Sequence, residues 1–201
     1  FAYLVEDTHH ALLQHITRIN LIPKDDYLMM DGFTLRNLEI VYSASQQGKS
    51  LLDIIDKTST PMGGRLLRRR IILPLKNISD INRRLNLIEF LNKEDVLKCD
   101  IKDLLKGISD LDRLIGKLAA EKISPKELGY LRQSVVNIQE IRTKLLKFPD
   151  VLAWLDPIIN LEDLIDFIKN HLNDELPVNI NKGNVIRDEI SQELDHLRNI
   201  Q

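Results

Sequence analysis

This chain of 201 residues has a single cysteine, Cys99, and few aromatic side chains. One cysteine excludes an internal disulfide and any zinc site built from several cysteines. Aromatic residues make up only 5% of the chain, and leucine and isoleucine dominate its apolar residues. This bias favours packed helices over a β-sandwich or a β-barrel. The composition therefore predicts an all-α, multi-helical fold.

An excess of one charge and long apolar runs are also missing. The formal net charge is −2, so no overall field attracts the chain to a polyanion such as DNA. No apolar run approaches the roughly 18 residues that a membrane-spanning helix needs. The segment Phe1–Asp7 lacks the basic-then-apolar order of a signal peptide. We therefore expect a cytoplasmic protein with no membrane partner.

No group of residues in the chain indicates catalysis or metal binding. His9, His10 and His15 lie close together in sequence, but no third ligand would face the same way. Carboxylate pairs such as Asp53 and Asp56 fall on amphipathic segments and lack a glycine-bearing calcium loop. We therefore expect no catalytic, metal-binding or cofactor-binding residue in this chain.

The tripeptide Gly48-Lys49-Ser50 resembles the end of a phosphate-binding loop. Such a loop has a glycine five residues before Gly48, and this chain has Ser43 there. The loop also follows a buried strand, whereas residues 38–42 have the pattern of a helix. We therefore interpret the tripeptide as a connection between helices and expect the chain not to bind ATP.

Apolar residues recur at spacings of three and four through most of the chain, which predicts a series of amphipathic helices. The expected helices cover residues 3–20, 34–42, 50–57 and 61–73, a segment capped by Ser79, and segments near 101–105, 111–118 and 187–201. A small β-hairpin is expected near 178–186, with Gly183 in its turn. The last helix has no glycine or proline cap before Gln201, so we expect it to continue in a longer protein.

The clearest local signal is Ser124-Pro125-Lys126-Glu127, a capping box with proline at the first helical position. A row of apolar residues at helical spacing follows it: Leu128, Leu131, Val135, Ile138, Ile141 and Leu145. A helix over 125–147 would be roughly 35 Å long at about 1.5 Å per residue. A small core does not need such a length, so the pattern predicts a strut.

Residues 57–79 contain six basic side chains and no acidic one. Arg65, Arg68 and Arg69 would share a helical face, and such a face can neutralise DNA phosphates. Aromatic side chains for stacking on bases are absent from this stretch, and arginine clusters also pair with acidic groups of neighbouring domains. Arg65, Arg68, Arg69 and Arg70 are therefore predicted to contact either DNA or another domain.

Five ordered motifs resemble the core, or lever, domain of the MutS family of DNA mismatch-repair ATPases, and together they extend over nearly the whole chain. They are Met29-Asp31-Thr34-Arg36-Asn37-Leu38-Glu39 followed by Ser50-Leu51-Leu52-Asp53, Thr58-Ser59-Thr60-Pro61-Met62-Gly63-Gly64-Arg65-Leu66-Leu67-Arg68 and Leu73-Pro74-Leu75; Ile108-Ser109-Asp110-Leu111-Asp112-Arg113-Leu114; Ser124-Pro125-Lys126-Glu127-Leu128; Gly183-Asn184-Val185-Ile186-Arg187; and Glu193-Leu194-Asp195-His196-Leu197-Arg198. The family usually has tryptophan where this chain has Arg70.

The resemblance implies that residues 1–201 are the first segment of a core domain, up to the insertion of a DNA clamp. A helical core would cover about 1–123, and long lever helices with the hairpin would cover about 124–201, the last helix being truncated. In the family this region joins a mismatch-reading region to the ATPase domain. The parent protein would then be a homodimeric, DNA-dependent ATPase that uses ATP and magnesium, while this segment has a structural and allosteric role and is not an enzyme.

Two other interpretations remain. One is a MutS paralogue that does not recognise mismatches. The other is a stand-alone helical adaptor that binds a protein partner through the 125–147 strut. A clamp-like insertion and a nucleotide-binding loop in the sequence after Gln201 would favour the ATPase family, whereas a stop codon there would favour the adaptor.

Overall fold

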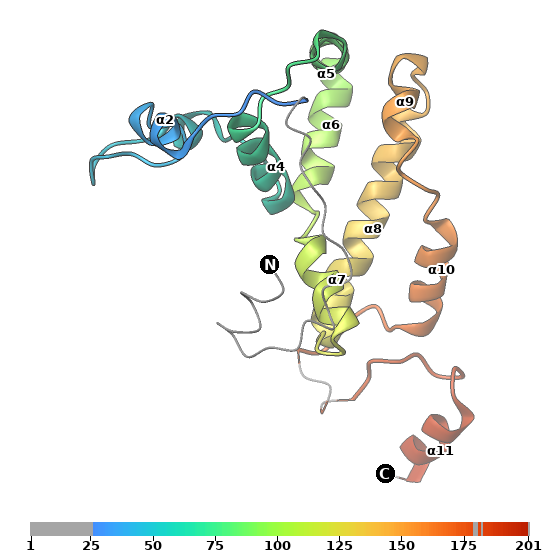
Figure 1. Cartoon of the computed structure of the whole chain (residues 1–201). Coiled ribbons are helices and arrows are strands. Elements are labelled where there is room, and N and C mark those ends of the chain that lie inside the picture. The colour runs from blue at the N-terminus through green and yellow to red at the C-terminus, as the bar shows by residue number, and fades with distance from the viewer. Residues whose placement is uncertain (1–25, 179–180, 182, 201) are drawn as a thin grey trace.

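The computed structural model describes residues 26–178, 181 and 183–200 (Figure 1). Their regular structure is helical, and strand pairing among them is limited to two isolated bridges, Tyr27 with Leu75 and Leu172 with Ile186. The prediction of an all-α fold is thereby confirmed. The helix expected over residues 3–20 lies outside the described residues. None of the helices that the structure describes is long and apolar enough to cross a membrane.

The longest described helix, α8 (Pro125–Leu145), is the predicted strut. Its capping box is complete, since the Ser124 side chain accepts a hydrogen bond from the Glu127 N–H and the Glu127 side chain accepts one from the Ser124 N–H. Its 21 residues give a length of about 32 Å. The helix ends two residues earlier than the pattern predicted, at Leu145.

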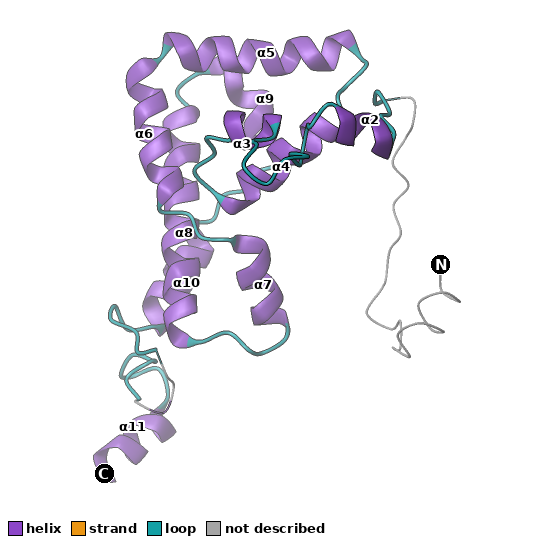
Figure 2. Cartoon of the chain, turned by 90° about the vertical axis from the view of Figure 1, so that its left-hand side faces the viewer, coloured by secondary structure: helices purple, strands orange, loops and turns teal. Residues whose placement is uncertain are grey.

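Helix α8 is the centre of the packing. The helices and the short turn around it are α5 (Ile78–Lys93), α6 (Asp95–Lys106), α7 (Leu111–Ala119), η2 (Pro149–Val151), α9 (Leu152–Leu155) and α10 (Glu162–His171). Helices α6, α7, α9 and α10 contact α8 directly, and α5 lies across the end of α6 (Figure 2). The main apolar cluster joins α7, α8 and α10 through Leu114, Leu131, Val135 and Ile165. We call α5 to α10 the body.

Polar side chains on the buried face of α8 bind the ends of neighbouring segments. Ser134 is fully buried and accepts a hydrogen bond from the Ser109 N–H, just before α7. Asn137 donates to the Leu104 carbonyl oxygen near the end of α6. Gln139 accepts a hydrogen bond from the Leu161 N–H, at the start of α10. These contacts give the Ser109 and Leu161 N–H groups a partner, and they give the Leu104 carbonyl oxygen a second donor beside the Gly107 N–H.

We call residues 26–60 the N-terminal arm. It includes α2 (Gly32–Asn37) and α3 (Leu51–Ile55), and α4 (Pro61–Ile72) connects it to the body. Side-chain caps start the three helices at Asp31, Ser50 and Thr60. Helices α2 and α3 are shorter than the segments 34–42 and 50–57 that the pattern predicted. The arm projects from one side of the body (Figures 1 and 2).

Three local expectations change in detail. Helix α5 begins at Ile78, because the Asn77 side chain accepts the Ser79 N–H and takes the capping role expected of Ser79. Part of the hairpin expected near 178–186 lies outside the described residues, and Ile186 forms its bridge with Leu172 after α10. Helix α11 (Gln192–Ile200) starts later than Arg187, after a turn that the Ser191 hydroxyl closes by accepting the Leu194 N–H.

Candidate interaction surfaces

The four arginines of interest lie on the second and third turns of α4, whose first turn is fixed by its cap. The Thr60 hydroxyl accepts a hydrogen bond from the Gly63 N–H, and Pro61 occupies the first position. Helix α4 has no buried residue, and all four arginines are exposed. The helix is therefore a surface element.

The Arg65 side chain binds two carboxylates of the same domain. Its guanidinium donates two parallel hydrogen bonds to the Asp110 carboxylate, Nη1 to Oδ2 and Nη2 to Oδ1, both at 2.8 Å, and a third to Asp112 at 2.6 Å. Asp110 also caps α7 by accepting the Arg113 N–H. The hydrogen bonds from Arg65 lower the pKa of Asp110 to about 2, while those to Asp110 and Asp112 raise the pKa of Arg65. Arg65 therefore ties α4 to the start of α7.

Arg68 turns back over the arm. Its Nη2 atom donates to the Tyr42 hydroxyl at 2.6 Å, and its guanidinium carbon lies 5.2 Å from the centroid of the same ring. Both contacts border a groove of about 490 Å³ that is lined by apolar residues including Leu35, Val41 and Ile72. Arg68 therefore helps to position the arm against α4.

Arg69 and Arg70 differ from the first two arginines. Neither side chain makes a hydrogen bond or an ion pair with the residues that the structure describes. Partial burial lowers the pKa of Arg70, and the like charge of Arg84 on α5 adds to that effect. The three arginines of the predicted face therefore differ. Arg65 and Arg68 have partners within the domain, whereas the side chains of Arg69 and of the neighbouring Arg70 could bind a group outside it. A contact of these four residues with DNA or another domain stays a prediction.

The tripeptide Gly48-Lys49-Ser50 leads directly into α3. Ser50 is fully buried, caps α3, and donates its hydroxyl proton to the Asp53 carboxylate at 2.7 Å. That hydrogen bond lowers the pKa of Asp53. A side chain at Gly48 would come within 2.1 Å of the Ser43 hydroxyl oxygen, so the loop closes tightly on itself. The glycine and the serine thus have structural roles, and the absence of ATP binding stays a prediction.

The other candidate ligands also have local roles. Asp56 accepts hydrogen bonds from the Thr58 N–H and hydroxyl, which lower the pKa of Asp56. His9, His10 and His15 lie outside the described residues. Within the described ranges, no three side chains of histidine, cysteine, aspartate or glutamate form a group that could hold a metal ion.

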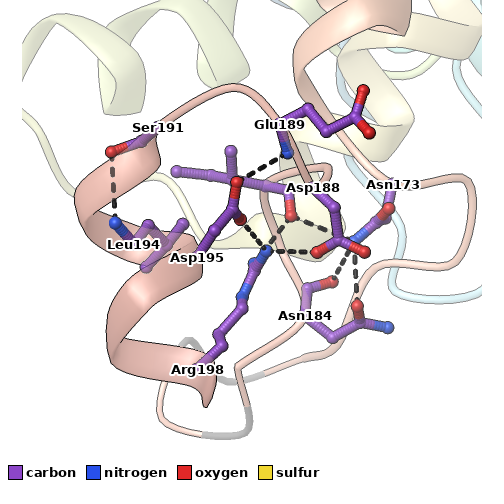
Figure 3. A network of polar contacts seen from close by, with 9 residues as sticks. Asn173, Asn184, Asp188, Glu189, Ser191, Leu194, Asp195 and Arg198 are labelled. Atoms are coloured by element: carbon purple, nitrogen blue, oxygen red, sulfur yellow. Dashed lines mark hydrogen bonds and ion pairs between the residues drawn. The ribbon is translucent and has the colours of Figure 1, made fainter. Parts of the chain in front are cut away.

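A dense polar network surrounds the turn before α11, and we did not predict it from the sequence. Its labelled members are Asn173, Asn184, Asp188, Glu189, Ser191, Leu194, Asp195 and Arg198 (Figure 3). Arg198 donates to Asp188 at 2.6 Å, and the Asn173 amide donates to the Asn184 carbonyl oxygen at 3.1 Å. Half of these eight residues fall within the last two motifs of the MutS resemblance, which was the available signal.

The N-terminal arm carries a second unusual surface. Eight of its large apolar side chains are between 42% and 72% exposed, and they are Leu28, Met29, Phe33, Leu38, Tyr42, Leu51, Ile54 and Ile55. In contrast, Ile40 is the single buried apolar side chain in the described part of the arm. A surface of this composition is typical of a contact with another protein segment.

Comparison with known proteins identifies the family. A family model described as MutS domain III matches residues 33–200. The chain is 42% identical over 200 residues to the DNA mismatch repair protein MutS of Flavobacterium johnsoniae and 43% identical over 200 residues to that of Flavobacterium psychrophilum. It is 38% identical over 195 residues to the MutS of Bacteroides thetaiotaomicron.

These alignments cover 96% to 98% of the chain but only 23% of each relative. The chain thus spans about a quarter of the length of the curated relatives that it matches. The predicted resemblance is confirmed: the chain belongs to the MutS family, of which it contains domain III.

Proposed function

We propose that this domain is the structural frame of a DNA mismatch-repair ATPase, linking its mismatch-reading and ATPase regions to a DNA clamp. The observation that carries the proposal is the apolar surface of the N-terminal arm. Eight exposed apolar side chains within residues 28–55 are costly in water. Relatives about four times as long provide further chain that could cover this surface.

Helix α8 gives the frame its stiffness. It is held along its length by an apolar cluster and by the hydrogen bonds of Ser134, Asn137 and Gln139. A displacement at one end of such a packed helix reaches the other end, because close-packed interiors deform little. The proposed role is therefore mechanical and needs no catalytic residue in this chain.

The activities of the whole protein belong to the same proposal. The parent would bind mismatched DNA, hydrolyse ATP with magnesium in a separate domain, form a homodimer and work in the cytoplasm. A MutS paralogue without mismatch recognition would use the same frame. The adaptor alternative is less well supported, because α6, α7 and α10 already pack on the 125–147 strut through which it would bind.

Hydrogen exchange tests whether the arm is an internal contact surface. We expect the amides of residues 28–55 to exchange faster in the 201-residue chain than in the full-length parent, where other domains cover them. Residues around Ile159, which is 70% exposed on the body, provide a reference region that should exchange alike in both. Equal exchange of the arm in the two proteins would contradict the proposal.

A variant of the full-length parent tests whether the arm takes part in its function. Replacing Phe33 and Leu38 together by glutamate should weaken ATP-dependent release of the full-length parent from mismatched DNA, because the arm would no longer transmit the nucleotide state. Ile159→Glu is the matched control, since it places the same charge on an exposed apolar position of the body. Unchanged release in the double variant would argue against a coupling role for the arm.

A further inference from the structure

Three arginines connect α8 to α11, and each donates to main-chain carbonyl oxygens. The first is Arg132 on α8, whose side chain is only 17% exposed. Its Nη1 atom donates to the Asn173 carbonyl oxygen at 3.1 Å, and its Nη2 atom donates to that of Asp174 at 3.0 Å. Arg132 therefore holds the segment after α10 against the strut.

The second arginine, Arg187, holds together two segments that are distant in sequence. Its N–H donates to the His171 carbonyl oxygen, and its Nε donates to that of Leu172 at 2.9 Å. Its Nη2 atom also donates to the Asp174 carboxylate at 3.0 Å. With the bridge between Leu172 and Ile186, these bonds fix the segment before α11 to the end of α10.

The third arginine, Arg198, lies on α11 and reaches back to the turn before that helix (Figure 3). Its Nη2 atom donates to the Ile186 carbonyl oxygen at 2.8 Å, and its Nη1 atom donates to Asp188 at 2.6 Å. Asp195, one turn earlier on α11, accepts the Glu189 N–H at 2.8 Å. The helix and its preceding turn are thus one hydrogen-bonded unit.

Apolar packing of α11 is limited to one side, where the half-buried Leu194 lines a groove together with Val185 and Ile186. Leu197 is 59% exposed and Ile200 is 68% exposed, and the helix lies beyond the first turn of α8, away from the body (Figures 1 and 2). Its direction therefore depends on the polar contacts. The planar, charged guanidinium group suits this task, because it donates several directed hydrogen bonds at once.

The backbone of the turn indicates a fixed joint and not a swivel. Asn184 has φ of 55° and Glu189 has φ of 69°, which residues other than glycine adopt at a cost. Each is held by the network, since the Asn173 amide bonds to Asn184 and Asp195 bonds to the Glu189 N–H. Such conformations persist where the surroundings determine them.

We infer that Arg132, Arg187 and Arg198 form a stiff arginine joint that makes α11 follow the movements of α8. The inference extends the proposed mechanical function by naming the residues that would transmit motion at this end of the domain. A flexible connection between α8 and α11 would contradict the joint without affecting the proposed function. Conversely, the joint could be stiff in a protein that does not have that function.

Distance measurements between spin labels on α8 and α11 test the joint. The labels replace Glu140 and His196, both exposed, in a chain in which Cys99 is serine. We expect a narrow distance distribution in this background. Arg187→Gln and Arg198→Gln should each widen it by at least about twofold, because the segment loses directed hydrogen bonds. Widths equal to the background would overturn the inference.

Two further variants separate the joint from charge and from misfolding. Lys169→Gln removes a cation that lines the same groove of about 470 Å³ as Arg132 and Arg187, so its distribution should stay narrow. Arg198→Lys keeps the charge but cannot bond both Ile186 and Asp188 in the same way, so its distribution should widen. Broadening by Lys169→Gln, or none by Arg198→Lys in a chain with a native helical spectrum, would contradict the joint.

Discussion

Two carboxylates with strongly lowered pKa values hold α7 at its two ends. Asp110 caps α7 and binds Arg65 of α4, while Glu127 lies in the capping box of α8 and binds Lys117 of α7. The hydrogen bond from Lys117, with that from the Ser124 N–H, lowers the pKa of Glu127 to about 2. Each of these residues joins a helix start to a neighbouring helix, so single side chains organise this part of the body.

These two carboxylates predict how stability depends on pH. Their folded pKa values of about 2 lie below the ordinary values of 3.8 and 4.5. The unfolded chain therefore binds more protons in this range, and the stabilisation present above about pH 5 is lost as the pH falls toward 2. Asp110→Asn and Glu127→Gln should each flatten the dependence of the free energy of unfolding on pH between 2 and 5, measured with urea.

Asp163→Asn serves as the control for the pH experiment, because Asp163 is exposed in the first turn of α10 and makes no ion pair within the described part of the chain. Its pH profile should run parallel to that of the wild type. Parallel profiles for Asp110→Asn and Glu127→Gln as well would mean that these carboxylates do not stabilise the fold.

The left-handed conformation of Glu189 gives a second prediction at this scale. Glycine adopts φ of 69° without the steric cost that a side chain carries, and Glu189→Gly keeps the N–H that Asp195 accepts. We expect the variant to be more stable to urea by up to about 1 kcal/mol. Glu175→Gly, in an exposed loop without positive φ, should be neutral or destabilising. A loss of stability in Glu189→Gly would show that the Glu189 side chain matters more than backbone strain.

At the scale of elements, the sequence predicts helices better than it predicts what joins them. The start of α8 could be predicted because its capping box is local, and α4 ends before Pro74 for a similarly local reason. The partner of Arg65 lies 45 residues away, so no local pattern identifies it. The sequence alone therefore could not tell which arginines of the basic stretch have partners within the domain. The structure shows that Arg65 and Arg68 have such partners, whereas the side chains of Arg69 and Arg70 have none among the described residues.

The buried polar side chains of α8 show the same limit. Ser134, Asn137 and Gln139 would be assigned to solvent from their chemistry, yet all three are buried. Their partners include main-chain groups more than 20 residues away in sequence, which are the Ser109 and Leu161 N–H groups between helices and the Leu104 carbonyl oxygen in the last turn of α6. Burial of a polar residue depends on tertiary contacts, which a helical spacing pattern does not contain.

Asn137 provides the test at this scale. Asn137→Ala removes one of the two donors to the Leu104 carbonyl oxygen, which keeps the hydrogen bond from the Gly107 N–H at 3.1 Å. We expect a loss of about 0.5 to 1.5 kcal/mol in the free energy of unfolding, the net contribution of one hydrogen bond. Glu140→Ala, on the exposed side of the same helix, should change it by less than about 0.5 kcal/mol. A small effect of Asn137→Ala would mean that water replaces the lost hydrogen bond.

Across the whole molecule, apolar and polar contacts have different locations. An apolar cluster joins α7, α8 and α10 of the body, the N-terminal arm exposes apolar side chains, and α11 is held by the arginine joint. The arm and α11 also leave the body at different places (Figures 1 and 2). A domain that exposes an apolar contact surface on its arm and holds α11 by a stiff joint fits the proposed mechanical role.

The last prediction concerns DNA, for which net charge and the two unpaired arginines both matter. The chain carries a formal charge of −2, and the guanidinium groups of Arg69 and Arg70 lack an ion-pair or hydrogen-bond partner among the described residues. We expect the chain to bind duplex DNA more weakly than about 1 μM at physiological salt, without preference for a mismatch. Fluorescence anisotropy with matched and G·T-containing duplexes measures both quantities.

Variants assign that weak binding to particular side chains. Replacing Arg69 and Arg70 by glutamine should reduce the binding and lower the slope of log affinity against log salt by about 2, one for each phosphate contact. Arg65→Gln should instead lower stability, because Asp110 and Asp112 lose their partner. A mismatch preference in the wild-type chain would contradict the mechanical role. Unchanged weak binding in the double variant would favour a contact of Arg69 and Arg70 with another domain, since their charges would then contribute nothing to phosphate neutralisation.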